Sequence, residues 1–411
     1  MTETLPLQGV RVLDFGTAWA GPAIGEILSD LGAEVIKIES RTKLDGMRVG
    51  RPMVGDVIKG DAGNEPELQP IFHSLNRGKK SLTIDFKTPE GLNLLRDLIV
   101  VSDVTTDNFS PGVLDRAGIG YKDLVKIKPD IIVQSMSGAG ATGPLASIVA
   151  YAPTTTALSG TTSLVGTEDG RNVMPQRGYG DANSAIHAAI AILLALHQRE
   201  QTGQGQWIDV AEVETATVLL GEPFADYFMN RRVATPRGTF HPAMAPHNIY
   251  PCEGDDTWVA IAVTGEQEWR AFCAAIGKPD IAEQPAFADA VQRVRNRKEL
   301  DGIVSAWTRQ KTPRDAADAL QAAGVASEPV MNAHDHYFDP GFNYRKAWVE
   351  VEHPILGNIT LPAVPWRLSD TPCKITGHAP TLGQHNGYVC HDLLGVPQER
   401  VDELAAMKVL Q

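Results

Sequence analysis

The fold of this 411-residue chain is decided by residues 10–39, which read VRVLDFGTAWAGPAIGEILSDLGAEVIKIE. Two short runs rich in branched apolar residues, 10–15 and 35–38, have the length and composition of buried strands. Between them, a glycine-rich turn ends at Gly21-Pro22 and a helix-like segment runs to Leu31. The stretch therefore predicts a strand, a helix and a second strand.

The same alternation continues along the chain. Further strand-like runs lie at residues 81–86, 104–108, 131–135 and 206–210, and helix-like segments lie at residues 89–100 and 184–201. Strands that alternate with helices at this spacing form a parallel sheet with helices on both faces. We predict an α/β protein with a large Rossmann-like domain of this kind.

The composition of the chain changes after Arg231, where proline, glycine and histidine become frequent. We expect residues 1–230 to form the N-terminal part of the large domain, 235–325 a smaller α/β domain, and 326–411 a C-terminal segment that returns to the large domain. The small domain would contain a strand at 258–263 and helices within 266–302, and the returning segment a strand at 359–361 and a helix at 398–407. Residues 41–72 are expected to form a functional loop over the sheet. Residues 232–247 are expected to form a second loop that acts as a lid.

Charge and composition exclude several classes of protein. The chain has 37 basic and 50 acidic residues, a net charge of −13, so it offers no basic field to nucleic acid or an anionic membrane. The longest apolar run, 185–196, is shorter than the roughly 20 residues that a bilayer requires and is interpreted as a buried helix. Four scattered cysteines and the absence of an apolar leader favour a cytoplasmic protein.

Two cofactor interpretations are weak. Glu39 ends the second strand, where an acid can bind the ribose of a dinucleotide, but Gly16 and Gly21 are too far apart for the G-x-G-x-x-G turn. His241 and His247 flank a proline-containing turn with no acidic or cysteine partner nearby, so a structural or substrate-facing loop is favoured over a metal site.

Two segments leave alternatives open. Asp181 lies between Gly180 and an apolar helix, a place typical both of a helix N-cap and of an ionised, accessible carboxylate. Residues 76–81, with the sequence NRGKKS, are either a solvated turn or, together with Phe109 and Arg116, a clamp for phosphates and a base.

Taken in order, these landmarks resemble the class III CoA-transferases, the family that includes formyl-CoA transferase and carnitine CoA-transferase. The pieces that carry the resemblance are residues 9–22, 31–39, 76–81, 87–91 and 108–116, Gly180-Asp181, Arg199, residues 202–205 and residues 379–385. The resemblance covers nearly the whole chain.

The resemblance implies that Asp181 is a catalytic nucleophile and that a coenzyme A thioester is the substrate, with no permanently bound cofactor and no metal. It places coenzyme contacts at Ala18, Trp19, Ala20, Arg41, Lys79, Asn108, Phe109, Arg116 and Ser137. It further implies an interlocked homodimer, with a hetero-oligomer of related subunits as the alternative.

Several positions depart from formyl-CoA transferase. Ser40 stands in place of an arginine, Trp19 in place of a glutamine, and Ser137 and Ala139 in place of a lysine and a tyrosine. These differences argue against formate–oxalate chemistry. They favour a bulkier acceptor, such as a benzylsuccinate-like acid, with succinyl-CoA as the donor.

The expected reaction transfers CoA from an acyl-CoA to a free carboxylic acid through an aspartyl mixed anhydride and an aspartyl-CoA thioester. Two other functions remain open. α-Methylacyl-CoA racemases are similar, but they pair the acid with a histidine where this chain has Tyr151. A non-catalytic CoA-binding subunit is the third interpretation, and the presence of Asp181 argues against it.

Overall fold

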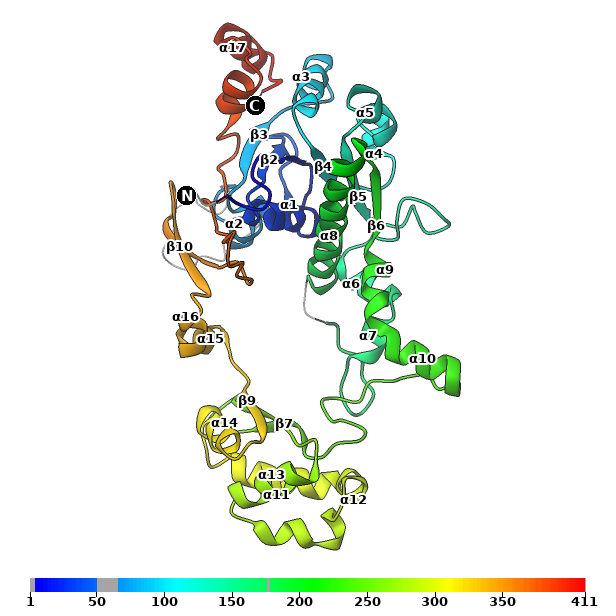
Figure 1. Ribbon diagram of the computed structural model, residues 1–411, viewed down its shortest axis with the longest axis vertical. Coiled ribbons are helices and arrows are strands. Elements are labelled where there is room, and N and C mark those ends of the chain that lie inside the picture. The colour runs from blue at the N-terminus through cyan, green and yellow to red at the C-terminus, as the bar shows by residue number, and fades with distance from the viewer. Residues whose placement is uncertain (1–3, 50–65, 176–177, 411) are drawn as a thin grey trace. The chain divides into compact units, whose positions relative to one another are not determined.

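The computed structural model describes residues 4–49, 66–175 and 178–410 (Figure 1). The chain divides into two compact units. Unit 1 comprises Met1–Thr161, Pro175–Ala225 and Gly341–Gln411, and unit 2 comprises Thr162–Met174 and Asp226–Pro340.

Unit 1 is built on a six-stranded sheet. Its strands are β1 (Arg11–Asp14), β2 (Glu34–Glu39), β3 (Lys80–Thr83), β4 (Val104–Asp107), β5 (Ile132–Ser137) and β6 (Trp207–Ala211). Every pairing is parallel and the order is β3-β2-β1-β4-β5-β6. The predicted α/β fold with a parallel sheet is confirmed, and each predicted strand of unit 1 lies at or within a few residues of its expected place.

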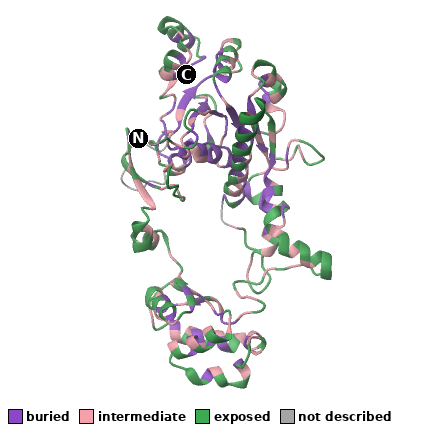
Figure 2. Cartoon of the chain, in the orientation of Figure 1, coloured by how far each residue is buried: buried purple, intermediate pink, exposed green. Residues whose placement is uncertain are grey.

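Helices cover both faces of this sheet because successive side chains of each strand point to opposite sides. Val12 packs with α1 (Ala20–Asp30) and α8 (Tyr179–Thr202), whereas the next residue, Leu13, packs with α3 (Pro89–Val100) on the other face. The second face is completed by α4 (Val113–Arg116), α5 (Tyr121–Ile127), η6 (Tyr388–Leu393) and α17 (Gln398–Ala406). The buried strands and helix faces are visible in Figure 2.

Helix α8 begins at Tyr179, five residues earlier than the predicted start at residue 184, because Gly178 with φ 81° forms the turn that starts it. Its length and composition would suit a membrane span. However, Ala185, Ala188 and Ile192 are buried against the sheet. The helix is therefore a core helix of unit 1, as predicted.

Shorter elements complete unit 1. They are η1 (Gly46–Arg48), α2 (Pro70–Asn76), α6 (Ala152–Leu158), α9 (Glu212–Thr217), η3 (Val218–Leu220) and the antiparallel pair β10 (Trp348–His353) and β11 (Gly357–Pro362). Within the expected loop at 41–72, residues 50–65 lie outside the described residues. The described ends of that loop contain η1 and the first turn of α2, so it is not wholly irregular.

Unit 2 has a three-stranded antiparallel sheet, β7 (His247–Pro251), β8 (Trp258–Ala262) and β9 (Ala326–Pro329). Trp269 and Phe272 lie in its core, to which the helices α11 (Glu266–Ala275), α12 (Ala290–Arg295), α13 (Arg297–Thr308) and α14 (Pro313–Ala322) contribute. Helix α15 (Ala333–Phe338) follows β9. Because β9 pairs with β8, residues 326–340 belong to unit 2 and the returning segment begins at Gly341. The segment 232–247 lies in unit 2, and its role as a lid stays a prediction.

Candidate active site

The candidate site lies where the strands of the parallel sheet end. β1 leads into the loop with Ala18 and Trp19, β4 ends before Asn108, β5 ends at Ser137, and β6 leads into Glu212 at the start of α9. The carboxyl ends of parallel strands meet at one edge, and open α/β sheets bind their ligands there. The topology thus collects residues that are far apart in the sequence.

The loop between β1 and α1 is held in one conformation by Asn108. Its Oδ1 accepts a hydrogen bond from the Thr17 backbone N at 2.8 Å, and its Nδ2 donates to the Thr17 carbonyl at 2.9 Å. Next in the chain, Ala18 has φ 60° and donates its backbone N–H to Asp45 Oδ1 at 2.9 Å. A Cβ at Gly21 would lie 2.6 Å from Asn108 Oδ1, so only glycine fits under this clamp.

Two buried lysines support the same loop from inside. Lys37 donates to the Gly16 carbonyl at 2.7 Å and pairs with Asp45 at 2.9 Å. Lys79 donates to Asp14 at 2.7 Å, to the Pro22 carbonyl at 2.7 Å and to Asn76 at 3.0 Å. An ammonium group has three N–H donors, so Lys79 has none left for a coenzyme phosphate in this structure. Its placement supports a structural role and does not support the predicted coenzyme contact.

Trp19 connects this loop to the helix that carries Asp181. A Cβ at Gly178, the N-cap of α8, would meet Trp19 Cε2 at 2.9 Å, so the indole ring lies directly against this glycine. Asp181 lies in the first turn of α8, whose N-cap position is Gly178 and has no side-chain cap bond. The interpretation of Asp181 as the N-cap residue is therefore wrong. A Cβ at Gly180 would lie 3.0 Å from Thr155 Oγ1 of α6, so α6 packs closely against the residue before Asp181.

Asp181 faces a second acid that the motif analysis of the sequence does not identify. Asp181 is half-buried, and burial raises the pKa of its carboxyl group. Glu212 is only 7% exposed, and burial, with a further contribution from the charge of Asp181, raises its pKa to about 7. The one signal for Glu212 in the sequence is its place directly after a strand.

A cleft of about 320 Å³ opens beside the ends of β4, β5 and β6. Phe109 and Ser137, two predicted coenzyme contacts, both line it, together with Trp207. The Ser137 hydroxyl is buried and has no hydrogen-bond partner among the described residues. The structure thus brings an aromatic ring and a free hydroxyl group into one cavity.

The cleft also contains a buried acid, Asp107. Burial raises the pKa of Asp107 to about 6 and the charge of Asp115 adds to this effect, although hydrogen bonds from the Phe109 backbone N–H and the Ser135 hydroxyl oppose it. Asp107 therefore keeps its proton to a higher pH than an ordinary aspartate.

The two predicted arginine contacts are exposed and lie in different places. The guanidinium group of Arg116 lies over Gly112, where a Cβ would be 3.0 Å from its Nη1, and Gly112 lines the cleft. Arg41 follows β2 and donates to the Leu382 carbonyl at 3.2 Å. Arg116 is therefore beside the cleft, whereas Arg41 links the loop after β2 to the C-terminal segment.

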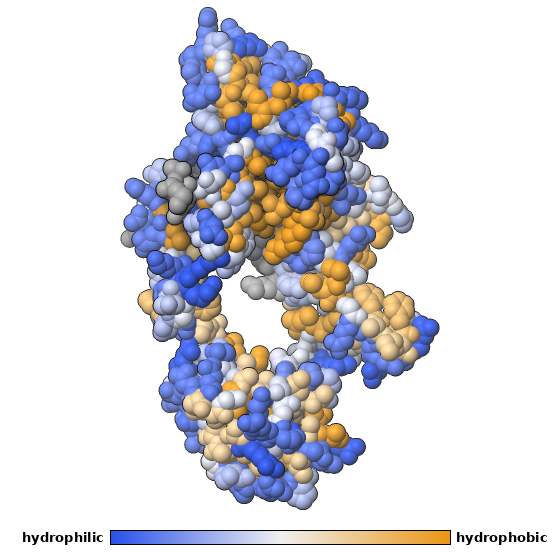
Figure 3. Space-filling view, in the orientation of Figure 1, coloured by the Kyte–Doolittle hydropathy of each residue, from blue (hydrophilic) through white to orange (hydrophobic). Residues whose placement is uncertain are grey.

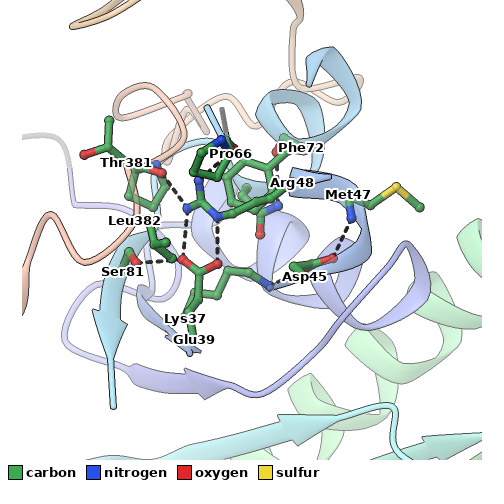
Figure 4. Close-up of polar contacts among 12 residues, drawn as sticks. Lys37, Glu39, Asp45, Met47, Arg48, Pro66, Phe72, Ser81, Thr381 and Leu382 are labelled. Atoms are coloured by element: carbon green, nitrogen blue, oxygen red, sulfur yellow. Dashed lines mark hydrogen bonds and ion pairs between the residues drawn. The ribbon is translucent and has the colours of Figure 1, made fainter. Parts of the chain in front are cut away.

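Glu39, the candidate ribose ligand of a dinucleotide, belongs to a buried ion network (Figure 4). Arg48 donates to both of its carboxylate oxygens, at 2.8 and 2.9 Å, and the Ser81 hydroxyl donates to Oε2 at 2.6 Å. Arg48 also pairs with Glu67 at 2.7 Å. Because Glu39 is 7% exposed and both of its oxygens are bonded to Arg48, it is buried away from any ribose, and this geometry opposes the nicotinamide interpretation.

The histidines of unit 2 do not assemble a metal site. The rings of His241 and His247 have centroids 5.2 Å apart. Within residues 4–49, 66–175 and 178–410, no group of three histidine, cysteine, aspartate or glutamate side chains is arranged to hold a metal ion.

Comparison with known proteins agrees with this architecture. The model of CoA-transferase family III matches residues 7–386. The succinyl-CoA–D-citramalate CoA-transferase of Chloroflexus aurantiacus is 34% identical over 406 residues, which are 98% of each chain. The human succinyl-CoA:glutarate CoA-transferase is 29% identical over all of this chain and 91% of its own. The crystal structure of a CAIB/BAIF family protein from Brucella suis superimposes with a TM-score of 0.85 and 30% identity, over 95% of this chain and 99% of that one. The chain therefore belongs to CoA-transferase family III and is a CoA-transferring enzyme.

Proposed function

We propose that this enzyme transfers CoA from succinyl-CoA to a free dicarboxylic acid, with Asp181 as the nucleophile. One observation carries the proposal. Asp181 is half-buried in the first turn of a long helix, and its carboxylate has no hydrogen bond or ion pair among the described residues. The helix dipole favours its ionised form, which is the form that attacks a thioester.

The reaction balances without any added reagent. The Asp181 carboxylate attacks the thioester carbonyl, the C–S bond breaks, and CoA leaves as a thiolate, so that a mixed anhydride of Asp181 and the donor acid is formed. The thiolate then attacks the Asp181 carbonyl, which releases the donor acid and leaves an aspartyl-CoA thioester. The acceptor carboxylate attacks this thioester, its C–S bond breaks, and CoA thiolate leaves behind a second mixed anhydride between Asp181 and the acceptor. The thiolate finally attacks the acceptor carbonyl of this anhydride, which forms the new acyl-CoA and releases the Asp181 carboxylate.

The cleft at the ends of β4, β5 and β6 supports a place for the coenzyme. Phe109 presents a ring on which adenine can stack, and the Ser137 hydroxyl is free to bond a polar group. Lys122 lines the same cleft and Arg116 lies beside it, so cations are available for phosphates. The loop at Ala18, Trp19 and Ala20 would hold the thioester end.

The proposed substrates of this enzyme are taken from those of similar enzymes. Two of them use succinyl-CoA, and their acceptors, D-citramalate and glutarate, are dicarboxylic acids. A benzylsuccinate-like acceptor stays a prediction, since it rests on Trp19 and Ala139 alone. A cytoplasmic location also stays a prediction.

We also propose that the enzyme is a homodimer. Three residues along one face of α8, Ile186, Ile190 and Leu194, are 51%, 51% and 64% exposed. Apolar residues gather on this side of unit 1 in Figure 3. A contiguous apolar helix face of this kind supports contact with a second copy, as the family resemblance implies.

The test is CoA exchange between succinyl-CoA and a panel of acids, with the products detected by mass spectrometry. The panel contains D-citramalate, L-malate, glutarate, oxalate and benzylsuccinate. The wild-type enzyme should form at least one new acyl-CoA and accumulate a CoA adduct on the peptide that contains Asp181. Asp181→Ala should abolish both. Asp97→Ala, at an exposed acid on α3, is the matched control and should retain exchange. Exchange by Asp181→Ala at the wild-type rate would refute the proposed nucleophile.

A further inference from the structure

The helices that carry Asp181 and Glu212, α8 and α9, are joined near their N-terminal ends. The hydroxyls of Ser184 and Thr215 share a hydrogen bond of 2.6 Å, and Asn183 Nδ2 donates to the Thr215 carbonyl at 2.7 Å. Residues three apart lie on the same face of a helix. Asp181 precedes Ser184 by three residues and Glu212 precedes Thr215 by three, which places the two acids on the helix faces that meet at this seam. The charge of Asp181 acts on Glu212 across it.

The backbone of Glu212 is also fixed beside the coenzyme cleft. Ala211, the residue before it, pairs with Ser137 in the sheet, and the Val213 N–H donates to the Gly138 carbonyl at 2.9 Å. The Thr215 hydroxyl has its second contact with the Glu212 carbonyl, at 2.9 Å. Glu212 is therefore held in place between the nucleophile and the end of β5.

No cation among the described residues neutralises this pair of acids. The elements packed on α9 are α6, α8, η3 and β6. Helix α6 and η3 contain no aspartate, glutamate, histidine, lysine or arginine. In α8, Asp181 is the charged group that acts on Glu212, and Nδ1 of His187 is hydrogen-bonded to the Asn183 carbonyl at 2.9 Å. In β6, Asp209 is bound to the Ala141 backbone N–H at 2.9 Å. On α9 itself, Glu214 is exposed.

Two facing carboxylates in a partly buried seam cannot both ionise without a large cost, so the pair keeps one proton at mildly acidic pH. Glu212 is the more buried partner, which disfavours its charge. Asp181 lies at the start of a helix of 24 residues, whereas α9 has 6, so the helix dipole stabilises the charge on Asp181 more. The proton therefore resides on Glu212.

We propose that Glu212 is the positioning acid of the site: in its protonated form it keeps Asp181 ionised and leaves the seam able to accept the negative charge that develops on the thioester oxygen. This inference rests on the proposed role of Asp181. A neutral carboxyl group donates a hydrogen bond, whereas its ionised form repels an oxyanion. Loss of the proton to solvent thus turns the site off without moving any atom of the backbone.

The test is the pH profile of kcat/KM for succinyl-CoA, because kcat/KM reports the ionisation of groups in the free enzyme. The reaction is measured as the exchange of isotopically labelled succinate into succinyl-CoA. With a pKa of about 7, the wild-type kcat/KM should fall about eightfold between pH 6.5 and pH 8. Glu212→Gln is neutral at every pH and should change less than twofold over that range. Glu214→Gln, two residues away on the same helix, should follow the wild-type profile. An unchanged fall in Glu212→Gln would overturn the inference.

An infrared pH-difference spectrum of the intact enzyme supplies a second readout that does not depend on the fold of Glu212→Gln. The wild type should lose a carboxylic-acid band as the pH rises through 7, and Asp181→Asn should move that loss to lower pH, because it removes the repelling charge. An unmoved band would refute the pairing. The two proposals can fail separately. If Asp181→Ala stays active, Asp181 is not the nucleophile. If Asp181→Ala is inactive but Glu212→Gln keeps the wild-type pH dependence of kcat/KM, only the role of Glu212 is rejected.

Discussion

The indole ring of Trp19 lies against Gly178, the residue that starts the helix carrying Asp181. A Cβ on Gly178 would approach Trp19 Cε2 to 2.9 Å, and the φ of 81° at Gly178 is one that L side chains rarely adopt. This contact holds the loop after β1 against the N-terminus of α8. The contact thereby fixes the position of the proposed thioester site relative to the proposed nucleophile.

Gly178→Ala should therefore lower both stability and CoA exchange. The left-handed backbone alone costs about 1–2 kcal/mol, and the clash with Trp19 adds to it. Gly203→Ala is the matched control, since Gly203 ends the same helix with φ 69° and has no atom within 4 Å of an added Cβ. Urea denaturation should show the larger loss for Gly178→Ala. Equal losses in the two variants would contradict a tight Trp19 contact.

Arg48→Ala should destabilise the enzyme by about 3–5 kcal/mol, because it leaves the buried carboxylates of Glu39 and Glu67 without their partner. The exposed pair Arg400 and Glu403 provides the comparison, and Arg400→Ala should cost about 1 kcal/mol or less. Denaturant titration at neutral pH measures both. Similar values would show that the network of Figure 4 contributes little.

Acid should destabilise the enzyme through His353. Burial, with contributions from the nearby His73 and His378, lowers the pKa of His353 from 6.5 to about 4. The unfolded chain takes up this proton near pH 6.5 and the native protein resists it, so stability is lost as the pH falls below 6.5. The loss amounts to about 2 kcal/mol between pH 7 and pH 5.

The check is His353→Asn, in which an amide oxygen replaces Nδ1 as the acceptor for the N–H groups of Ile355 and Leu356. Its stability, measured by denaturant titration at both pH values, should fall by about 2 kcal/mol less than that of the wild type. His334→Asn, at an exposed histidine, should keep the wild-type pH dependence. A wild-type slope in His353→Asn would exclude this group as the source.

Leu194→Glu tests the homodimer. A charge at this position, which is 64% exposed on the apolar face of α8, should convert the dimer to a monomer at micromolar concentration. Val291→Glu places the same charge at a residue of α12 that is 58% exposed and should leave the mass unchanged. Light scattering after size-exclusion chromatography gives the masses. A monomeric wild-type enzyme would reject the proposal.

The local parts of the fold were predictable from the sequence because their causes are local. The helix at residues 89–100 was predicted to the residue, since Thr88 caps it and Pro89 suits its first turn. The strands β1 and β2 followed from short apolar runs. In contrast, β9 has only Ser327 buried in its four residues and exists because it pairs with β8.

Asp181 was a candidate because of its place between a glycine turn and an apolar helix, which is a property of neighbouring residues, and because of a family resemblance that covers nearly the whole chain. Only the tertiary structure paired it with Glu212, engaged every donor of Lys79, and covered both oxygens of Glu39. Burial and charge pairing depend on which distant segments meet, and that is decided when the strands align and bring their ends to one edge of the sheet.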